Sequence, residues 1–454
     1  MKSNSLPSGW KLLTVDDIKA PSEGAIAIGP FGSRMKAECY VPVGVPVIRG
    51  NNLTGLTTFG GDFVYVSDDT ADSMRNCNAF GGDLVFPHRG AIGQVGLVPA
   101  DGKRYMLSTS LMKLSCNREI ANPRFLYFFF RSDAGRHELL KNASTVGTPG
   151  IGQPLSTLRS IRLPLPPKYD QDRIADILGT LDDKIELNRR MNETLEATAR
   201  RLFRSWFIDF DAVHAKAAVR REHPKLGNAE LSRRALPNMA PEIAELFPDS
   251  FEDSTLGPIP KGWKVAALNQ IAEVIMGSSP PGDTYNDIGL GTPLVNGPVE
   301  FGERFTIRRK WTTQPGRLAQ SNDLIFCVRG STTGRRVISD GIYCLGRGVC
   351  AMRPRNGEWC FIHQLIAFSL ERMLTRVSGS VFPNLNGPDL KQFVVVVPPS
   401  PFRSEFQRIV EPLMMQVAAK VFASESLECV RDSLLPRLLN GELNANGLVR
   451  GSHD

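Results

Sequence analysis

The sequence lacks the runs and residue pairs that mark membrane, secreted and zinc-binding proteins. No window of about 20 residues is continuously apolar, so we expect no transmembrane helix. The first ten residues have no apolar core of the kind that a signal peptide needs. The eight cysteines include no Cys-x-x-Cys pair, which argues against both a disulfide framework and a zinc site. These absences indicate a cytoplasmic protein with reduced thiols, without metal and without a membrane partner.

Motifs for catalysis are also missing. There is no Gly-x-x-x-x-Gly-Lys-Ser/Thr phosphate loop, no Gly-x-Gly-x-x-Gly and no His-Glu-x-x-His. An adenine methyltransferase would need Asn or Asp before a Pro-Pro-aromatic turn, but here Leu165 and Val397 precede the Pro-Pro pairs, and Lys168 and Ser400 follow them. We interpret these pairs as the ends of strands that lead into helices. We therefore expect no catalytic residue and no cofactor in this chain.

The basic charge of the chain falls into two blocks. The net charge is +7. Residues 1–168 hold 19 Lys and Arg against 13 Asp and Glu, and residues 259–400 hold 16 against 10, so each block carries +6. Residues 169–258 carry −4 and residues 401–454 carry −1. Two modestly basic modules suggest two contacts with a polyanion.

Three pieces of sequence recur in the same order, which is the mark of an internal repeat. Between these pieces, short β-rich runs are cut by Gly, Pro and Asn turns, and a few helical stretches intervene, which predicts mixed α and β structure. We expect two similar globular units, each followed by a helix. The first piece, Leu6-Pro7-Ser8-Gly9-Trp10-Lys11, returns as Ile259-Pro260-Lys261-Gly262-Trp263-Lys264. The second, Asp83-Leu84-Val85-Phe86 followed by Arg89-Gly90, returns as Asp323-Leu324-Ile325-Phe326 followed by Arg329-Gly330. The third, Leu158, Pro166 and Pro167, returns as Leu390, Pro398 and Pro399.

The two expected helices share a coiled-coil seam. Apolar residues recur at alternating spacings of four and three from 174 to 206 and again from 406 to 438, with an offset of 232 at every position. Each helix could pack on its own unit, but the equal seam lengths and the matched polar centres favour pairing with each other. Pro412 predicts a kink or a late helix start, because proline costs about 3 kcal/mol inside a helix. The polar centres are Asn188 and Asn192 in the first seam and Lys420 and Ser424 in the second.

Four further runs carry a family resemblance. The run from Phe203 to Val213, FRSWFIDFDAV, resembles the conserved central region of Type I restriction-modification specificity (S) subunits. The run Leu246–Phe251 that leads to Leu256–Trp263, the C-terminal run Ser433–Leu443 and the run Gly29–Ser33 are similar to other segments of that family. The resemblance spans nearly the whole chain, and the central run is its most specific part.

The resemblance implies an α+β fold with a pseudo-twofold internal repeat. Two similar α/β target recognition domains would be separated by two long helices that form an antiparallel coiled coil. Each seam spans 33 residues, or roughly 50 Å of helix. That length suits two recognition domains that contact DNA about one helical turn apart. The expected boundaries are 1–168 and 259–400 for the recognition domains, 169–212 and 401–443 for the conserved helices, 213–258 for a crossover linker and 444–454 for a tail.

The resemblance also implies a function and partners. The chain would be non-catalytic and would read a bipartite site in double-stranded DNA, one part with each recognition domain. Two modification subunits would bind S-adenosylmethionine and methylate adenine, and restriction subunits could join with ATP and Mg²⁺. An antiparallel pairing with centred seams would place Asn188 opposite Ser424 and Asn192 opposite Lys420.

The residues that touch DNA are expected among basic and amide side chains in turn-like surroundings. Lys and Arg hold phosphates, and Arg, Asn, Ser or Thr read base edges. Each candidate taken alone could equally be a solvated surface residue. The candidates are Arg34, Lys36, Arg49, Asn51, Asn52 and Arg89 in the first half, and Arg308, Arg309, Lys310, Arg329, Thr332, Thr333, Arg335 and Arg336 in the second.

Three rival interpretations remain. A stand-alone methyltransferase-nuclease lacks its motifs. A coiled-coil scaffold that binds only protein explains the helices but not the two basic blocks. A half-size relative that works as a homodimer is made unnecessary by the repeat within one chain.

Overall fold

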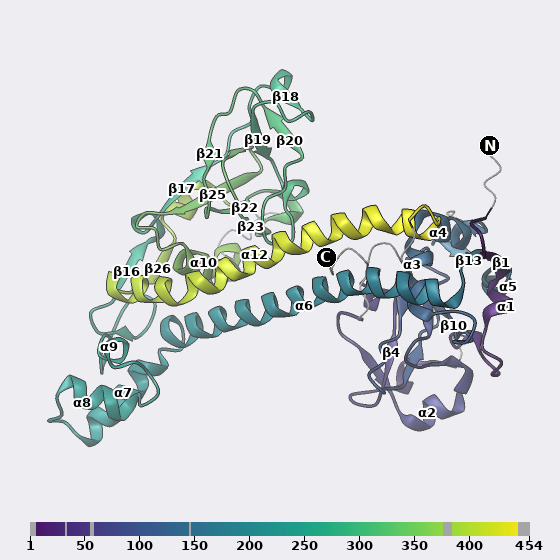
Figure 1. Cartoon of the computed structure of the whole chain (residues 1–454). Coiled ribbons are helices and arrows are strands. Elements are labelled where there is room, and N and C mark those ends of the chain that lie inside the picture. Colours follow the sequence, from purple (N-terminus) through teal and green to yellow (C-terminus); the bar gives the residue numbers. More distant parts are fainter. Residues whose placement is uncertain (1–5, 32–33, 55–58, 145–146, 376–383, 444–454) are drawn as a thin grey trace, which may run out of the picture. The chain divides into compact units, whose positions relative to one another are not determined.

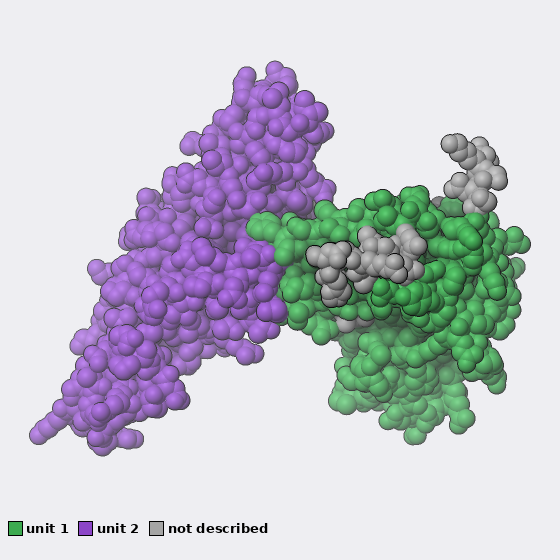
Figure 2. Space-filling model, viewed as in Figure 1, with its two compact units in different colours: residues 1–190, 422–454 green, residues 191–421 purple. Residues whose placement is uncertain are grey.

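A computed structural model of the chain describes residues 6–31, 34–54, 59–144, 147–375 and 384–443. The expected tail at 444–454 lies outside the described residues, as do Gly32 and Ser33 of the Gly29–Ser33 run. The chain divides into two compact units (Figure 2). The first unit is formed by residues 1–190 and 422–454, and the second by residues 191–421.

The first unit contains two main sheets. One has the strand order β2-β10-β7-β8, with every neighbouring pair antiparallel. The other has the order β3-β5-β4-β9-β6, in which only the pair β4 and β9 is parallel. The strands are β2 (Ile26–Ile28), β3 (Tyr40–Val41), β4 (Val45–Ile48), β5 (Val64–Val66), β6 (Asn78–Ala79), β7 (Leu84–Pro87), β8 (Gly96–Leu97), β9 (Tyr105–Leu107) and β10 (Leu111–Leu114).

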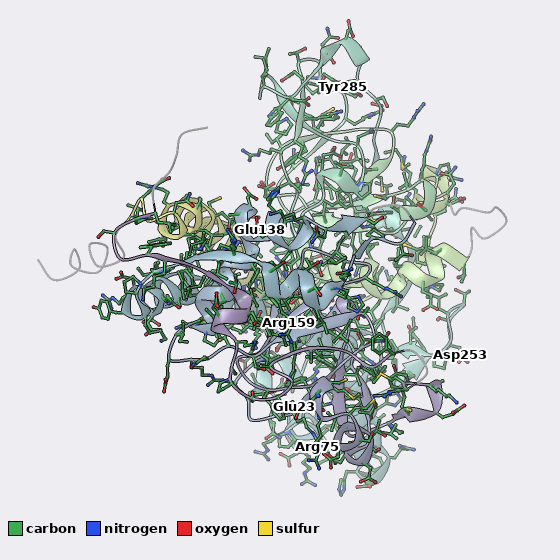
Figure 3. All side chains as sticks on the ribbon, turned by 90° about the vertical axis from the view of Figure 1, so that its right-hand side faces the viewer. Glu23, Arg75, Glu138, Arg159, Asp253 and Tyr285 are labelled. Carbon is green, nitrogen blue, oxygen red and sulfur yellow. The ribbon has the colours of Figure 1, made fainter. Side chains whose placement is uncertain are left out.

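The second unit repeats both sheets with the same strand order. Its four-stranded sheet is β17-β25-β22-β23, and its five-stranded sheet is β18-β20-β19-β24-β21, again with one parallel pair, β19 and β24. Tyr285 on β18 lies toward the outer end of this unit (Figures 1 and 3). The strands are β17 (Ala272–Met276), β18 (Tyr285–Asn286), β19 (Thr292–Val295), β20 (Lys310–Thr312), β21 (Leu318–Ala319), β22 (Leu324–Cys327), β23 (Arg336–Ile338), β24 (Tyr343–Leu345) and β25 (Val349–Pro354).

The recurring sequence pieces have structural roles. The first copy of the first piece leads into β1 (Lys11–Thr14), which pairs with β13 (Arg162–Leu165). The second copy leads into β16 (Lys264–Ala267), which pairs with β26 (Val394–Val397). Strands β13 and β26 each precede a Pro-Pro pair. The second piece begins with Asp83 or Asp323, whose carboxylates accept from the backbone N–H of Phe80 at 2.9 Å and of Gln320 at 2.8 Å. Each aspartate thereby fixes the turn that leads into the strand after it, β7 in the first unit and β22 in the second.

Short helices cover the sheets and complete the cores. Helix α3 is capped by Asn122, whose side chain accepts from the backbone N–H of Arg124 and Phe125, and Pro123 occupies its first turn. Its buried aromatic side chains pack in the core of the first unit. The remaining small elements are α1 (Val15–Ile18), α2 (Asp68–Ser73), α3 (Pro123–Arg131), α4 (Asp133–Leu140), α5 (Pro154–Ser160), α10 (Trp359–Thr375), α11 (Gly387–Lys391), β11 (Ala143–Ser144), β12 (Gly150–Ile151), β14 (Phe251–Glu252) and β15 (Ile259–Pro260).

Two 40-residue helices, α6 (Lys168–Phe207) and α12 (Ser400–Leu439), pass through both units. All twenty predicted seam positions are buried or half-buried. The expectation of a late helix start at Pro412 is wrong, because α12 begins at Ser400 and continues through this residue. Phe402, Phe406 and Val410 are buried in that first part, so their packing offsets the hydrogen bond that proline removes. The kink stays a prediction.

In the first unit, the helices run antiparallel (Figure 1). Asn188 Nδ2 donates to Ser424 Oγ at 3.1 Å, which is the pairing that the centred antiparallel register predicts. Asp182 of α6 is fully buried and accepts from Arg431 of α12 at 2.7 Å and from Arg131 of α3 at 3.1 Å. One carboxylate therefore joins both helices to the recognition domain of this unit.

In the second unit, the helices meet in an aromatic cluster. Phe406 of α12 contacts Phe203, Trp206 and Phe207 of α6, with ring centroids 5.6, 6.2 and 5.3 Å away. Residues of the run from 203 to 213 thus help to build the core of this unit, and Trp263 of the recurring piece packs on Phe207. Asn192 is buried and its Oδ1 has no hydrogen-bond partner among the described residues. Its pairing with Lys420 stays a prediction.

The segment between α6 and the second recognition domain forms three helices, α7 (Asp211–Glu222), α8 (Asn228–Ala235) and α9 (Pro241–Ala244). The fully buried Lys216 ammonium donates to Asn228 Oδ1 and to the carbonyls of Ala244 and Phe247 at 2.8, 3.1 and 2.6 Å. Burial lowers the pKa of Lys216. Three oxygens around one ammonium hold this crossover together.

None of the helices in the described part of the chain has the length and apolar character needed to span a membrane.

The buried Asp182 allows a stability prediction. Asp182→Ala should lower the free energy of unfolding of the whole chain by about 3–5 kcal/mol, because it leaves the Arg431 and Arg131 guanidiniums without their buried carboxylate. Denaturation by urea measures the change. Glu230→Ala, which removes the exposed ion pairs to Arg233 and Arg234, is the control and should leave the transition unchanged. Equal effects of the two substitutions would contradict the assignment.

Candidate nucleic-acid interface

One β-turn of the first unit joins the starts of three loops. The turn Ser108–Leu111 connects β9 to β10 and is closed by the Leu111 N–H, which donates to the Ser108 carbonyl at 3.2 Å. Three backbone hydrogen bonds attach the loop starts to this turn. We call the turn together with the three loop starts the first loop junction. The bonds are Gly29 N to Leu111 O at 2.8 Å, Ser108 N to Ile48 O at 2.9 Å and His88 N to Ser110 O at 2.9 Å.

The second unit has the same arrangement around the turn Gly346–Val349, which connects β24 to β25. The Val349 N–H donates to the Gly346 carbonyl at 3.2 Å and closes the turn. This turn and its loop starts form the second loop junction. The bonds, in the same order, are Gly277 N to Val349 O at 3.0 Å, Gly346 N to Val295 O at 2.8 Å and Val328 N to Gly348 O at 3.0 Å.

Sheet topology explains why the loops meet. Strands β2 and β7 both run antiparallel to β10, so their carboxyl ends lie at the same edge of the sheet. Strand β4 runs parallel to β9, so its end also meets the turn that follows β9. The equivalent strands of the second unit have the same directions. The order of strands therefore brings loops from distant parts of the sequence to one edge.

Close backbone contact makes glycine necessary at one loop start of each junction. A Cβ on Gly29 would lie 1.9 Å from the Ser108 carbonyl oxygen, and a Cβ on Gly277 would lie 2.1 Å from the Gly346 carbonyl oxygen. Such distances are far below contact distance, so any larger residue would force the loop away from the turn. Each junction is thus a closely packed backbone platform from which exposed side chains project.

Comparisons with known proteins identify the family. The family model for the Type I restriction modification DNA specificity domain matches residues 30–197 and again residues 260–413. The chain belongs to this family. The two matches fall on the two halves of the internal repeat, so the family resemblance expected from the sequence is confirmed. As a member of the family, the chain is a specificity subunit and not a catalytic one, in agreement with the sequence analysis.

Similar proteins span nearly the same length. A Type I restriction enzyme specificity subunit, HindI of Haemophilus influenzae, is 27% identical over 80% of this chain and 86% of its own length. The MjaIX specificity subunit of Methanocaldococcus jannaschii is 24% identical over 98% of this chain and 95% of its own length. The crystal structure of a Type I S subunit from M. genitalium is 17% identical, covers 96% of this chain and 97% of its own, and has a TM-score of 0.58, which shows the shared fold.

In the first recognition domain, the candidate side chains divide into two groups. Arg34 and Lys36 follow Gly29, Asn51 follows Ile48 and Arg89 follows His88, and all four side chains are exposed. The other two candidates are less exposed, since Arg49 is half-buried and Asn52 is buried. The loop junction thus brings four of the six predicted residues to loops that leave one edge.

Asn52 holds its loop together. Its amide is fully buried, its Oδ1 accepts from the Arg49 backbone N–H at 2.9 Å, and its Nδ2 donates to the carbonyls of Gly60 and Asp62. The half-buried Arg49 also donates to the Asp62 carbonyl, at 3.0 Å. Because its polar atoms are occupied and buried, Asn52 is not free to contact a base, and we remove it from the candidate set. Glu300 takes the same place in the second unit, where it accepts from the backbone N–H of Asn296 at 3.2 Å.

In the second recognition domain, Arg329 lies at the loop junction, directly after Val328, and is exposed. Arg308, Arg309 and Lys310 enter β20, whose first residues flank the carboxyl end of β19, so they reach the same sheet edge. Arg308 is partly engaged, since its Nε lies 3.4 Å from Tyr343 Oη and its Nη2 3.9 Å from Asp340.

The remaining four candidates lie in the hairpin between β22 and β23. Thr332 and Thr333 are half-buried there, and Thr333 donates to the Gly330 carbonyl at 2.7 Å. Arg335 and Arg336 line a groove of about 580 Å³ together with Arg200 of α6. Burial, and then the positive charge of Arg200, lower the pKa of Arg336. This hairpin is therefore a separate basic surface of the second unit.

Sequence analysis missed the central residues of both turns. Thr109 and Arg347 are exposed at the second position of their turns, and neither is among the residues predicted to contact DNA. The run Gly346-Arg347-Gly348 could have indicated a charged turn. His88 was missed as well: its buried ring lies with Nε2 3.2 Å from the Thr109 carbonyl oxygen, and burial lowers its pKa. Within the described residues, no group of three or more His, Cys, Asp or Glu side chains could hold a metal ion.

The junction geometry predicts the effect of one methyl group. Gly29→Ala places a Cβ against the Ser108 carbonyl, so it should destabilise the chain by about 1–3 kcal/mol and weaken recognition of one half of the DNA site. Gly50→Ala is the matched control, because nothing lies within 4 Å of its added Cβ. Thermal unfolding and methylation by the assembled complex measure both effects. If Gly29→Ala behaved like Gly50→Ala, the close packing of the junction would be refuted.

Proposed function

We propose that this chain is the DNA-reading subunit of a Type I restriction-modification complex and that each loop junction reads one half of a bipartite double-stranded DNA site. The observation that carries the proposal is the repeated junction, where exposed basic side chains lie on equivalent loops of two similar domains. Exposed Lys and Arg hold phosphates, while side chains on a fixed backbone read base edges. Two such readers on one chain suit a site with two defined parts.

The two long helices suit a spacer and a docking surface. Because α6 and α12 are each continuous over 40 residues, they would fix the gap between the half-sites. Apolar side chains on the helices of the first unit are exposed, namely Leu187, Phe422 and Val430. Exposed apolar side chains on these two helices favour contact with another protein. We assign this surface to modification subunits, two per chain, with restriction subunits as further partners.

The chemistry of the complex would then come from the partner subunits. S-adenosylmethionine would bind to the modification subunits, and ATP and Mg²⁺ to the restriction subunits. This chain would supply the DNA sequence preference alone, which agrees with the absence from its sequence of the motifs for phosphate loops and methyltransferases.

Exchange of one recognition domain tests the proposal. Replacing residues 1–168 by those of a related specificity subunit should change one half of the methylated motif and leave the other half as it was, because each junction lies within its own domain. Sequencing of methylated adenines after expression with the modification subunit reads the motif. A change in both halves would contradict the division of labour.

The polar centre of the helix pair gives a further prediction. Replacing Asn188, Asn192, Lys420 and Ser424 together by Leu should raise thermal stability or leave it unchanged, because buried polar groups fix register at a cost in stability. It should also loosen the gap that the complex tolerates between the half-sites. Methylation of DNA with varied gap lengths measures this. A variant that keeps one strict gap length would show that another part of the chain holds the spacing.

A further inference from the structure

The turn of the second loop junction presents a single side chain. Arg347 stands between Gly346 and Gly348, and its side chain is exposed. Neither glycine has room for a side chain, because a Cβ on Gly346 would lie 2.2 Å from Asn296 Oδ1 and a Cβ on Gly348 would lie 2.3 Å from the Asn296 carbonyl oxygen. The turn is thus pressed against the loop that follows β19, and Arg347 projects from a rigid base.

The guanidinium of Arg347 is available for a ligand. Two other arginines of the second unit are engaged within the protein: Arg353 pairs with Asp323 at 2.8 Å, and Arg304 pairs with Glu196 at 2.6 Å. Among the residues that the structure describes, none forms a hydrogen bond or ion pair with the exposed side chain of Arg347. An exposed guanidinium at the point where the loops converge, with which no described residue pairs, is suited to recognise a ligand.

The first loop junction carries a different side chain at the equivalent place. Thr109 occupies the position of Arg347, between Ser108 and Ser110, on a turn held by the same set of backbone hydrogen bonds. A threonine offers one hydroxyl and one methyl group on a short side chain, whereas an arginine offers two parallel donors at the end of a long one. Two platforms with equal backbone geometry therefore carry side chains that suit different bases.

We propose that Arg347 is a specificity-determining residue that selects a guanine in the second half-site, by donating two hydrogen bonds to the guanine O6 and N7 in the major groove. The inference rests on the proposed function and adds a residue and a base to it. Arg is the side chain whose fork matches these two acceptors, and such a pair discriminates against other bases on the order of tenfold to a hundredfold. Thr109 lacks the two parallel donors, so we expect no preference for guanine at the equivalent position of the first half-site.

A rigid base favours base readout over a phosphate contact. A phosphate accepts a lysine or an arginine from many directions, so it does not need a backbone platform with two glycines. Bidentate base readout does need a fixed backbone at the arginine, because both donors of the guanidinium must meet two acceptors of the base in one plane. The conservative variant Arg347→Lys separates the two, since lysine keeps the charge but loses the fork.

The test uses the full chain assembled with its modification subunits and a DNA library whose second half-site is randomised. Wild type should methylate sites with guanine at one position preferentially. Arg347→Lys and Arg347→Gln should lose that preference by on the order of tenfold or more, with the first half-site preference unchanged. Arg355→Lys, an exposed arginine of the same unit whose Nε donates to the Asn269 carbonyl, is the control and should keep the preference. Unchanged melting temperatures would show that the variants fold.

Two results would overturn the inference without touching the proposed function. In one, both Arg347 variants keep the wild-type preference at every position of a bipartite motif. In the other, they weaken methylation of all sequences equally, which would make Arg347 a phosphate contact. Failure of the proposed function itself would look different: the wild-type complex would then show no motif with two separate halves.

Discussion

Backbone hydrogen bonds to a single β-turn set the geometry of each recognition domain. The turns Ser108–Leu111 and Gly346–Val349 receive the starts of three loops that are far apart in the sequence, through bonds of 2.8–3.0 Å. Because the bonds involve only main-chain atoms, the surrounding side chains can vary while the platform stays the same. This separation of platform from side chains suits a family of proteins that read different DNA sequences with one fold.

The helix pair depends on a different kind of interaction in each unit. In the first unit the buried carboxylate of Asp182 bonds to guanidiniums from α12 and α3, and in the second an aromatic cluster around Phe406 joins α6, α12 and α10. A buried ion pair fixes direction and position because its atoms must meet, whereas aromatic packing contributes mainly burial. The internal repeat therefore extends to the strand order and the helix seams, but not to the side chains that join the helices in each unit.

Sequence analysis predicted much of the fold because its signals are periodic or repeated. The seams follow from spacing. The antiparallel direction that the family resemblance implies then places Asn188 opposite Ser424, as observed. The Pro-Pro pairs lie between a strand and a helix, as interpreted from their neighbouring residues. The site was harder, since exposure and loop convergence depend on strand order, which local patterns do not encode. Asn52 was taken for a contact although it is buried, and Arg347 was missed because a lone charged residue between two glycines resembles any turn. The late helix start at Pro412 was wrong because packing outweighs local propensity.

The central claim is that two equivalent junctions on one chain read two separate half-sites. Mapping every methylated adenine in cells that express this chain with its modification subunit tests the claim most directly. The account predicts one motif with two defined halves of different sequence, separated by an undefined gap of constant length. A single continuous motif, or two halves at variable distance, would contradict it.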